Sequence, residues 1–112
     1  MKKVGYGPIL EIRGNRIKDM RTLTYYRIEG EHIYEEGGGI RYSIYGNQIK
    51  DTFGGYMYEL SGSNINKVFG GFYASISGSY ITKYDNSEKY EVTCSLNKSQ
   101  TLLIAILVFG KQ

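Results

Sequence analysis

The sequence predicts an all-β protein: a meander of β-hairpin repeats, arranged radially and closed like a barrel, with a short apolar C-terminal helix. Three observations predict this fold. A 16-residue unit recurs six times along the chain, which is typical of repeat architectures. Apolar and polar residues alternate within each unit, as they do in half-buried strands. A two-residue turn signal interrupts the alternation at a fixed place, and an apolar stretch follows the last unit.

The length and composition are those of one small folded domain. The chain has 112 residues, of which 41% are hydrophobic, and this fraction is too high for a disordered chain. We expect a single domain over residues 1–112, with the hairpin repeats over 9–93 and the helix over 97–110. The net charge of +3 is small and the basic residues are scattered, so we expect no nucleic-acid partner.

Each unit is expected to form a hairpin with a fixed register. In the third unit Gly46 and Asn47 supply the two turn residues, because glycine tolerates the positive φ that tight hairpin turns require. A two-residue loop then places Ile44 opposite Ile49 on the neighbouring strand. The same count gives every hairpin one aliphatic pair: Ile12 with Ile17, Ile28 with Ile33, Ile44 with Ile49, Leu60 with Ile65 and Ile76 with Ile81.

One face of the predicted sheet is apolar and the other is mostly polar. The aliphatic pairs share their face with a residue two positions upstream, which is Leu10, Tyr26, Tyr42, Tyr58, Ala74 or Tyr90. One-sided burial is typical of antiparallel sheets with a solvated outer face. A meander of this kind must cover its apolar face, so we expect the hairpins to curl around an axis until the isoleucine pairs meet.

The apolar stretch from Leu102 to Phe109 predicts a helix, and Asn97 or Ser99 is expected to cap its start. A terminal strand is the alternative, because three of these eight residues are β-branched. A helix that is apolar on every side must be covered, so it either seals the core or forms an oligomer contact. It is too short to cross a bilayer, which takes about 20 residues, so we expect no membrane span.

The unit Ile-x-Gly-x-x-Ile-x-(Asp/Lys), followed by a turn with glycine and a Tyr-x-Ile strand, resembles the short hairpin repeats of the bacterial four-fold β-flower proteins. Members of that family often have Ile-Tyr-Asp after the turn, and fragments of it stand at residues 33–35 and 49–51. The similarity covers about residues 9 to 93 and extends to the apolar tail. It implies hairpins arranged like the petals of a flower around a pseudo-symmetry axis, and it implies no activity for any residue.

No residue pattern points to catalysis, a metal or a cofactor. His32 is expected on the outer face opposite Glu29, with no nucleophile motif beside it. Cys94 is the only cysteine and replaces a turn glycine, so we interpret it as a small apolar filler. Three carboxylates recur at the repeat spacing on the isoleucine side: Asp19, Glu35 and Asp51. We expect them to accept hydrogen bonds from nearby turn amides or to form ion pairs with basic side chains rather than to hold a cation.

Tyrosines on the predicted outer face give the strongest indication of binding. They are Tyr25, Tyr34, Tyr45, Tyr73 and Tyr80. Exposed aromatic rings beside polar side chains suit carbohydrates, peptides or another subunit, although packing between neighbouring hairpins is the favoured explanation. We therefore expect a non-enzymatic binding or self-assembly module with a protein partner or a second copy, and a glycan-binding module is the alternative. The N-terminal segment lacks the apolar stretch of a signal peptide, so we expect a cytoplasmic protein.

Overall fold

The computed structural model describes residues 1–5, 7–52, 56–68, 71–84, 88–92 and 95–109. Within this part of the chain, twelve strands form one sheet and a single helix follows them. The first six strands are β1 (Lys2–Lys3), β2 (Leu10–Arg13), β3 (Arg16–Asp19), β4 (Thr24–Glu29), β5 (His32–Glu35) and β6 (Ile40–Tyr45). The others are β7 (Gln48–Asp51), β8 (Tyr56–Ser61), β9 (Asn64–Lys67), β10 (Gly71–Ser77), β11 (Tyr80–Lys83) and β12 (Lys89–Glu91), and the helix is α1 (Lys98–Phe109).

The sheet is an antiparallel meander in which each strand from β2 to β11 pairs with the next one along the chain, and β12 pairs with β1. The predicted register is confirmed in all five hairpins with a two-residue loop, since Ile44 faces Ile49 and the four equivalent aliphatic pairs face each other in the same way. The short loops account for this success, because a tight hairpin leaves only one way to align its strands.

The glycine at each hairpin tip has the backbone conformation that the turn requires. Gly46 has a φ of +59°, and the equivalent glycines of the other hairpins lie between +59° and +61°. Asn47 at the second turn position is not in the positive-φ region, and this combination is that of a type II′ turn. The carbonyl of that second turn residue accepts a hydrogen bond from the following hairpin, as in Ile44 N–H to Glu31 O at 2.8 Å. The repeat therefore encodes the contact between hairpins as well as each hairpin itself.

The joints between hairpins deviate from regular pairing at a 16-residue spacing. The register shifts between β5 and β6, between β7 and β8, and between β9 and β10, which leaves Arg41, Met57 and Tyr73 as the extra residues. An extra residue in one strand is a β-bulge, and it rotates the side chains around it. The joint between β3 and β4 has no such shift, so Tyr25 keeps its regular place opposite Lys18.

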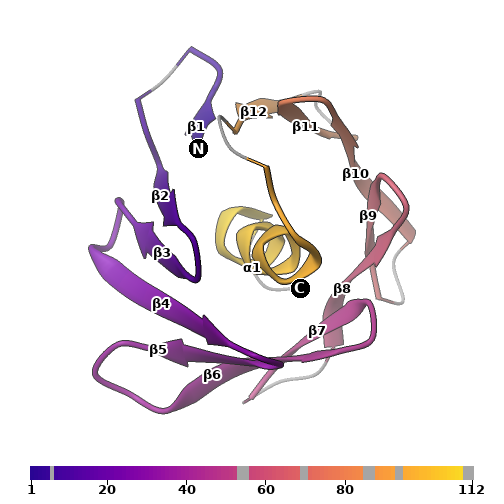
Figure 1. Cartoon of the computed structure of the whole chain (residues 1–112). Helices are drawn as coiled ribbons and strands as arrows, with labels where there is room; N and C mark the ends of the chain where they lie inside the picture. The colour runs from indigo at the N-terminus through magenta and orange to yellow at the C-terminus, as the bar shows by residue number, and fades with distance from the viewer. Residues whose placement is uncertain (6, 53–55, 69–70, 85–87, 93–94, 110–112) are drawn as a thin grey trace.

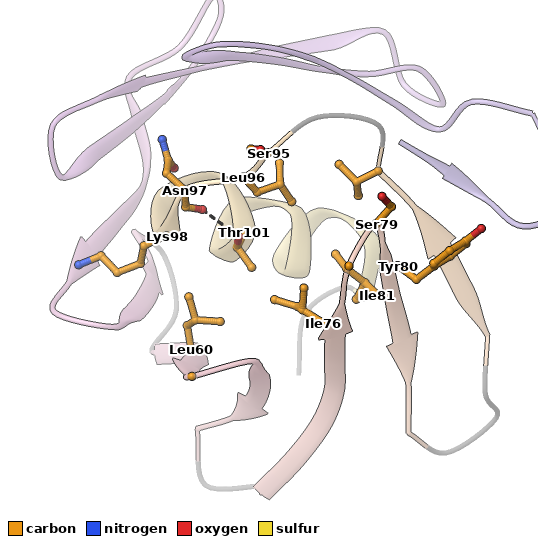
Figure 2. A pocket seen from close by; sticks show the side chains of 13 residues that line it. Leu60, Ile76, Ser79, Tyr80, Ile81, Ser95, Leu96, Asn97, Lys98 and Thr101 are labelled. Atoms are coloured by element: carbon orange, nitrogen blue, oxygen red, sulfur yellow. Dashed lines mark hydrogen bonds between the residues drawn. The ribbon is translucent and has the colours of Figure 1, made fainter.

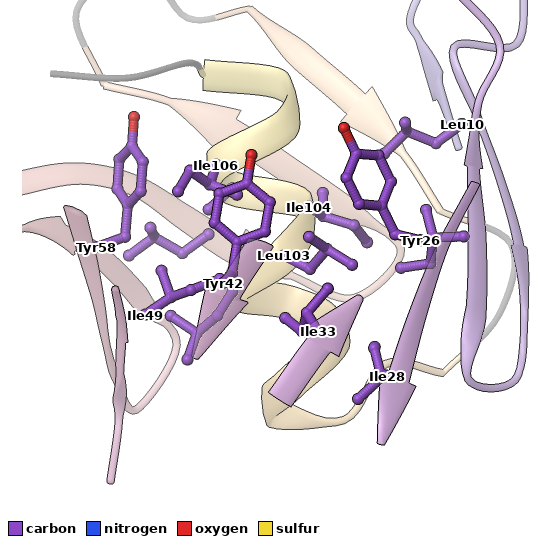
Figure 3. Close-up of a cluster of buried hydrophobic side chains, with 14 of the residues drawn as sticks. Leu10, Tyr26, Ile28, Ile33, Tyr42, Ile49, Tyr58, Leu103, Ile104 and Ile106 are labelled. Carbon is purple, nitrogen blue, oxygen red and sulfur yellow. The ribbon is translucent and has the colours of Figure 1, made fainter. Parts of the chain in front are cut away.

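Helix α1 lies inside the curved sheet, with strands around it on several sides (Figure 1). Residues Thr101 to Ile106 are all buried, and they pack with the isoleucines and inner tyrosines of the hairpins (Figure 3). The predicted helix is confirmed within a residue of its expected bounds over the part of the chain that is described, and the alternative of a terminal strand is wrong. The apolar tail therefore supplies the centre of the core.

Polar contacts hold both ends of the helix. At its start, Gln100 N–H donates to Asn97 Oδ1 and Asn97 N–H donates to Gln100 Oε1, each at 2.8 Å, which is a reciprocal capping box. The Gln100 amide also donates to the Gly14 carbonyl at 2.7 Å. Near its end, the Arg21 guanidinium donates to the Leu107 carbonyl at 2.8 Å while it pairs with Asp19. The first and last turns are thus bound to the β2–β3 region.

The two end strands of the sheet, β1 and β2, share no ladder among the described residues. Instead, the carbonyl of Met1 accepts hydrogen bonds from the Ile9 and Leu10 amides at 2.9 and 3.2 Å, and the Met1 ammonium donates to the Leu10 carbonyl at 2.8 Å. The structure thus establishes an antiparallel meander with one C-terminal helix. In the described part of the chain, α1 does not have the length needed to span a membrane.

Candidate functional site

A cleft of about 490 Å³ lies between the hairpin tips and the segment that leads into α1 (Figure 2). Ile76 and Ile81 point from the β10–β11 hairpin towards the helix, and Leu60 comes from the neighbouring hairpin. Val92 and Leu96 complete its five aliphatic side chains. The polar lining consists of Ser79, Tyr80, Ser95, Asn97, Lys98 and Thr101, together with the turn glycines Gly62 and Gly78.

The cleft exists because equivalent repeat positions differ in how well they are covered. Ile28 and Ile44 are 9% and 2% exposed, whereas Leu60 and Ile76 in the same repeat position are only partly buried. The start of the helix is bound through Gln100 to the β2–β3 hairpin, which lies across α1 from β9 and β10 (Figure 1). Leu60 and Ile76, like Ile12, are therefore less covered than Ile28 and Ile44, and the side chains of Leu60 and Ile76 form part of the cleft wall.

A second hollow of about 370 Å³ lies beside the same end of the helix but has a different character. It is lined by Ile28, two hairpin-tip glycines and the polar residues Asn15, Asn97, Ser99 and Gln100. Ile28 is its single aliphatic lining residue among those described. An apolar ligand would therefore find five aliphatic partners in the first cleft and one in this hollow, and we take the first as the candidate site.

Some polar groups of the cleft are already used by the helix cap, and others are not. The Thr101 hydroxyl donates to the Asn97 carbonyl at 2.8 Å, and Asn97 Oδ1 accepts the Gln100 amide. Lys98 is exposed and forms no ion pair within the described part of the chain. The described cleft lining contains no aspartate or glutamate, so Lys98 is its only charged side chain.

Three of the predicted binding tyrosines lie on the outer face with cationic groups over their rings. The Arg16 and Lys18 groups lie 4.9 and 5.2 Å from the centroid of Tyr25. Tyr34 and Tyr80 carry Arg27 at 5.1 Å and Lys89 at 6.0 Å in the same manner. These contacts are within the range of cation–π attraction, so each ring already has a partner on one face.

The other two predicted tyrosines are placed differently from each other. Tyr45 stands near a hairpin tip, opposite Gln48, and is 50% exposed. Tyr73 was expected on the outer face, and this expectation is wrong. Its ring lies 5.0 Å from that of Phe109 and 5.8 Å from that of the buried Tyr58, between centroids. The bulge at Tyr73 explains the inversion, because the extra residue turns the side chain to the inner face.

The predicted tyrosines do not gather in one groove. Tyr80 borders the cleft at the hairpin tips, although its ring points away from the helix (Figure 2). Tyr34 borders a separate outer groove of about 410 Å³ together with Arg16, Arg27 and Glu36. Tyr25 borders a third hollow of about 160 Å³. Each of these three hollows thus receives a different tyrosine.

Two of the three carboxylates that recur at the repeat spacing, Asp19 and Asp51, are held by arginines. Asp19 is 5% exposed and accepts bonds from the backbone and guanidinium of Arg21 at 3.0 to 3.1 Å. Asp51 is 2% exposed and accepts a 2.7 Å bond from Arg41, the residue that the bulge turns inwards. Among the described residues, no three acidic, histidine or cysteine side chains come together as a set able to hold a metal ion.

The inner tyrosines near these carboxylates resist ionisation. Burial, with the neighbouring Tyr42 and acidic groups, raises the pKa of Tyr26 to about 12. Burial also raises the pKa of Tyr42, against the effect of the Arg41 charge. For Tyr90, burial and a 2.9 Å bond from its hydroxyl to Glu88 raise the pKa to about 12. These rings therefore act as neutral parts of the core up to strongly alkaline pH.

The remaining candidates form no site. His32 is exposed and faces Glu29 across the β4–β5 hairpin, as expected from the register. Cys94 lies outside the described residues. Sequence reasoning missed the cleft, because the repeat pattern assigns Leu60 and Ile76 the same burial as their equivalents. One signal was present in the sequence. The helix begins at Lys98, although acidic residues are preferred in the first turn of a helix, and this first turn contains no acidic residue.

No family model, curated protein or solved structure matches this chain. The resemblance to the four-fold β-flower proteins stays a prediction.

Proposed function

We propose that this chain is a non-enzymatic binding module in which the hairpins and α1 form a scaffold and the cleft holds a small ligand. The observation that carries the proposal is the cleft of about 490 Å³ with five aliphatic walls and polar groups on one side. Small-molecule sites typically occupy about 300–1,000 Å³ and combine apolar walls with a few polar groups. The volume and the lining of this cleft both meet that description.

Two features of the fold support a role as a scaffold. The helix is buried from Thr101 to Ile106, so these residues serve the core and are not available for contacts with a second copy. We further propose that the sheet closes radially, as the repeats predict. The bonds of Met1 to Ile9 and Leu10 support closure, because they bring the β1 end of the sheet to the start of β2.

Filling the cleft tests the proposal. Ile76→Trp adds bulk to a cleft wall and is expected to abolish binding of 1-octanol, measured by saturation-transfer NMR on the full chain. Ile12→Trp is the matched control, because Ile12 has the same repeat position and is also partly buried, but it does not line the cleft. Equal octanol binding by both variants, or no binding by the unchanged chain, would refute the proposal.

A glycan-binding module is the second candidate, and the outer groove beside Tyr34 is the observation that favours it. Arg16 and Glu36, which pair at 3.0 Å, border this groove with Arg27 and offer hydrogen-bonding groups beside an aromatic ring. A saccharide array should then give signals that Tyr34→Ala removes and that Tyr45→Ala, outside the groove, retains. Retention of the signals by Tyr34→Ala contradicts this candidate.

A further inference from the structure

We infer that the ligand of the cleft is an aliphatic anion: a short apolar chain that carries one negatively charged group. This inference rests on the proposed function, because it names the ligand class of the same cleft. It combines two properties of the lining. The walls are aliphatic, and the only charged side chain among the described lining residues is the cationic Lys98.

The apolar half of the site comes from two hairpins, from Val92 after β12 and from the segment before the helix. Ile76 and Ile81 face the helix from one hairpin, and Leu60 stands beside them on the next (Figure 2). Leu60, Ile76 and Leu96 are only partly buried, so they have apolar surface that a ligand would remove from water. Burial of such surface is the main source of affinity for an apolar chain.

The charged half is Lys98, which lines the edge of the cleft and whose ammonium group is directed outward in Figure 2, away from the aliphatic side chains. Several basic side chains on the outer face are matched by carboxylates, as in Arg13 with Glu11, Arg16 with Glu36 and Arg27 with Glu29. Lys98 has no such partner within the described part of the chain. A carboxylate head group would supply the missing opposite charge, whereas a cationic ligand would meet repulsion.

The position of Lys98 also has a cost for the free protein. It occupies the first turn of α1, where the helix dipole disfavours positive charge, and no acidic residue in that turn offsets it. A residue that is unfavourable for the local structure, and that no contact within the protein compensates, is expected at a functional position. Replacement of Lys98 by glutamate should therefore have opposite effects on stability and on binding.

The test compares two probes of equal chain length, octanoate and 1-octanol, at neutral pH. Titrations followed by NMR of the Leu60, Ile76 and Leu96 methyl groups are expected to show about two- to fivefold tighter binding of octanoate by the unchanged chain, the effect of one favourable charge contact at an exposed lysine. Lys98→Glu is expected to remove this preference and leave octanol binding unchanged. The same variant should raise the thermal unfolding midpoint of the free protein, because it favours the helix dipole.

Lys18→Glu is the charge-matched control, because it changes the net charge equally on the outer face beside Tyr25. It should leave the affinity of both probes unchanged. Equal binding of the two probes, or an unaltered octanoate affinity in Lys98→Glu, overturns the anionic ligand class and leaves the binding cleft itself in place. Failure of both probes to bind overturns the cleft as a ligand site, and the inference with it.

Discussion

At the scale of single residues, Leu23 has a backbone conformation that its type disfavours. Its φ is +58°, the only positive value for a residue other than glycine in the described chain, and its side chain is 67% exposed. Gly71 stands at the equivalent place three repeats later, with a φ of +83°. The left-handed region costs a non-glycine residue about 1–2 kcal/mol, and the exposed Leu23 side chain has too little burial to offset this cost.

Leu23→Gly is therefore expected to stabilise the protein. The gain in unfolding free energy should be about 0.5–1 kcal/mol, because relief of strain is partly offset by the greater freedom of glycine in the unfolded chain. Urea unfolding measures it. Leu23→Ala is the matched control and should show no gain, since alanine retains the strain. A similar gain from alanine would assign the effect to the exposed leucine side chain instead.

The tyrosines of the core predict how stability depends on alkaline pH. The pKa of Tyr26 is about 12 in the folded protein, above the ordinary value of 10.0. Between these values the folded chain retains a proton that the unfolded chain has lost, so the unfolding free energy falls as the pH rises. Tyr26→Phe removes this titration, and urea unfolding at a series of pH values from 10 to 12 should show a shallower decline. A decline as steep as that of the unchanged chain contradicts the role of Tyr26.

The outer tyrosines show where residue-level prediction succeeded and where it stopped. Alternation within a strand places Tyr25, Tyr34 and Tyr80 on the outer face, next to the buried Tyr26, Ile33 and Ile81 of the inner face. Tyr73 occupies the same repeat position as Tyr25 but lies inside. The difference is a bulge in the joint between hairpins, and the sequence does not distinguish the two positions because both are tyrosine.

At the scale of elements, the helix depends on polar contacts at its start as much as on its apolar faces. Gln100 forms three hydrogen bonds there: its backbone N–H donates to Asn97 Oδ1, its side-chain oxygen accepts from the Asn97 N–H, and its side-chain amide donates to the Gly14 carbonyl. The last bond joins the helix to a hairpin 86 residues earlier in the sequence. Gln100 is 7% exposed, so its amide groups would have no water to replace these partners.

Gln100→Ala should destabilise the protein by about 2 kcal/mol, because it removes the side-chain half of the capping box and leaves the Gly14 carbonyl without its donor. Ser99→Ala serves as the control, since Ser99 lies next to it in the same first turn and has no such bond to the hairpin. Urea unfolding distinguishes the two. A loss of equal size in Ser99→Ala would indicate that helix propensity, not the bond to the hairpin, sets the effect.

The hairpins could be predicted from the sequence almost completely, and the joints between them could not. A two-residue loop with glycine first fixes the turn type and the register, so the pairs of isoleucines follow by counting. The longer joints allow several pairings, and three of them adopt bulges while the joint before β4 does not. The choice depends on the packing of the whole sheet around the helix.

At the scale of the whole molecule, the helix and the sheet each cover the apolar surface of the other. Leu102, Leu103, Ile104 and Ala105 are all 0% exposed, although they lie on every side of α1. Strands of the curved sheet lie around the helix (Figure 1). Without the helix, the inner isoleucines would surround an apolar void, and a void of this size is incompatible with the close packing of protein interiors.

Deletion of residues 98–112 should therefore abolish cooperative unfolding. The expected product is an expanded chain that binds hydrophobic dyes and lacks the near-ultraviolet circular dichroism of packed tyrosines. Both signals are measured on the purified fragment beside the full chain. A fragment that still unfolds cooperatively would show that the hairpins reach their packing without the helix.

The overall plan of the molecule was open to prediction, but the cleft was not. The 16-residue period implies a hairpin meander, and the apolar tail implies a covered helix. Neither the period nor the apolar tail shows to which hairpin the start of the helix is bound. That side is set by Gln100 and Gly14, two residues whose contact spans most of the chain, and it leaves Leu60 and Ile76 less covered than Ile28 and Ile44.

The bond from each hairpin tip to the next hairpin has a consequence for how such a protein can change in evolution. Identical links, such as Ile44 N–H to Glu31 O, would let a 16-residue unit be duplicated or lost without disturbing its neighbours. The girth of an α-helix, however, is constant at about 10–12 Å with its side chains. In the closed arrangement that we propose, a sheet that gains a hairpin would fit loosely around that cylinder, and one that loses a hairpin would fit too tightly. The helix at the centre would then restrict the number of repeats to the one that fits around it.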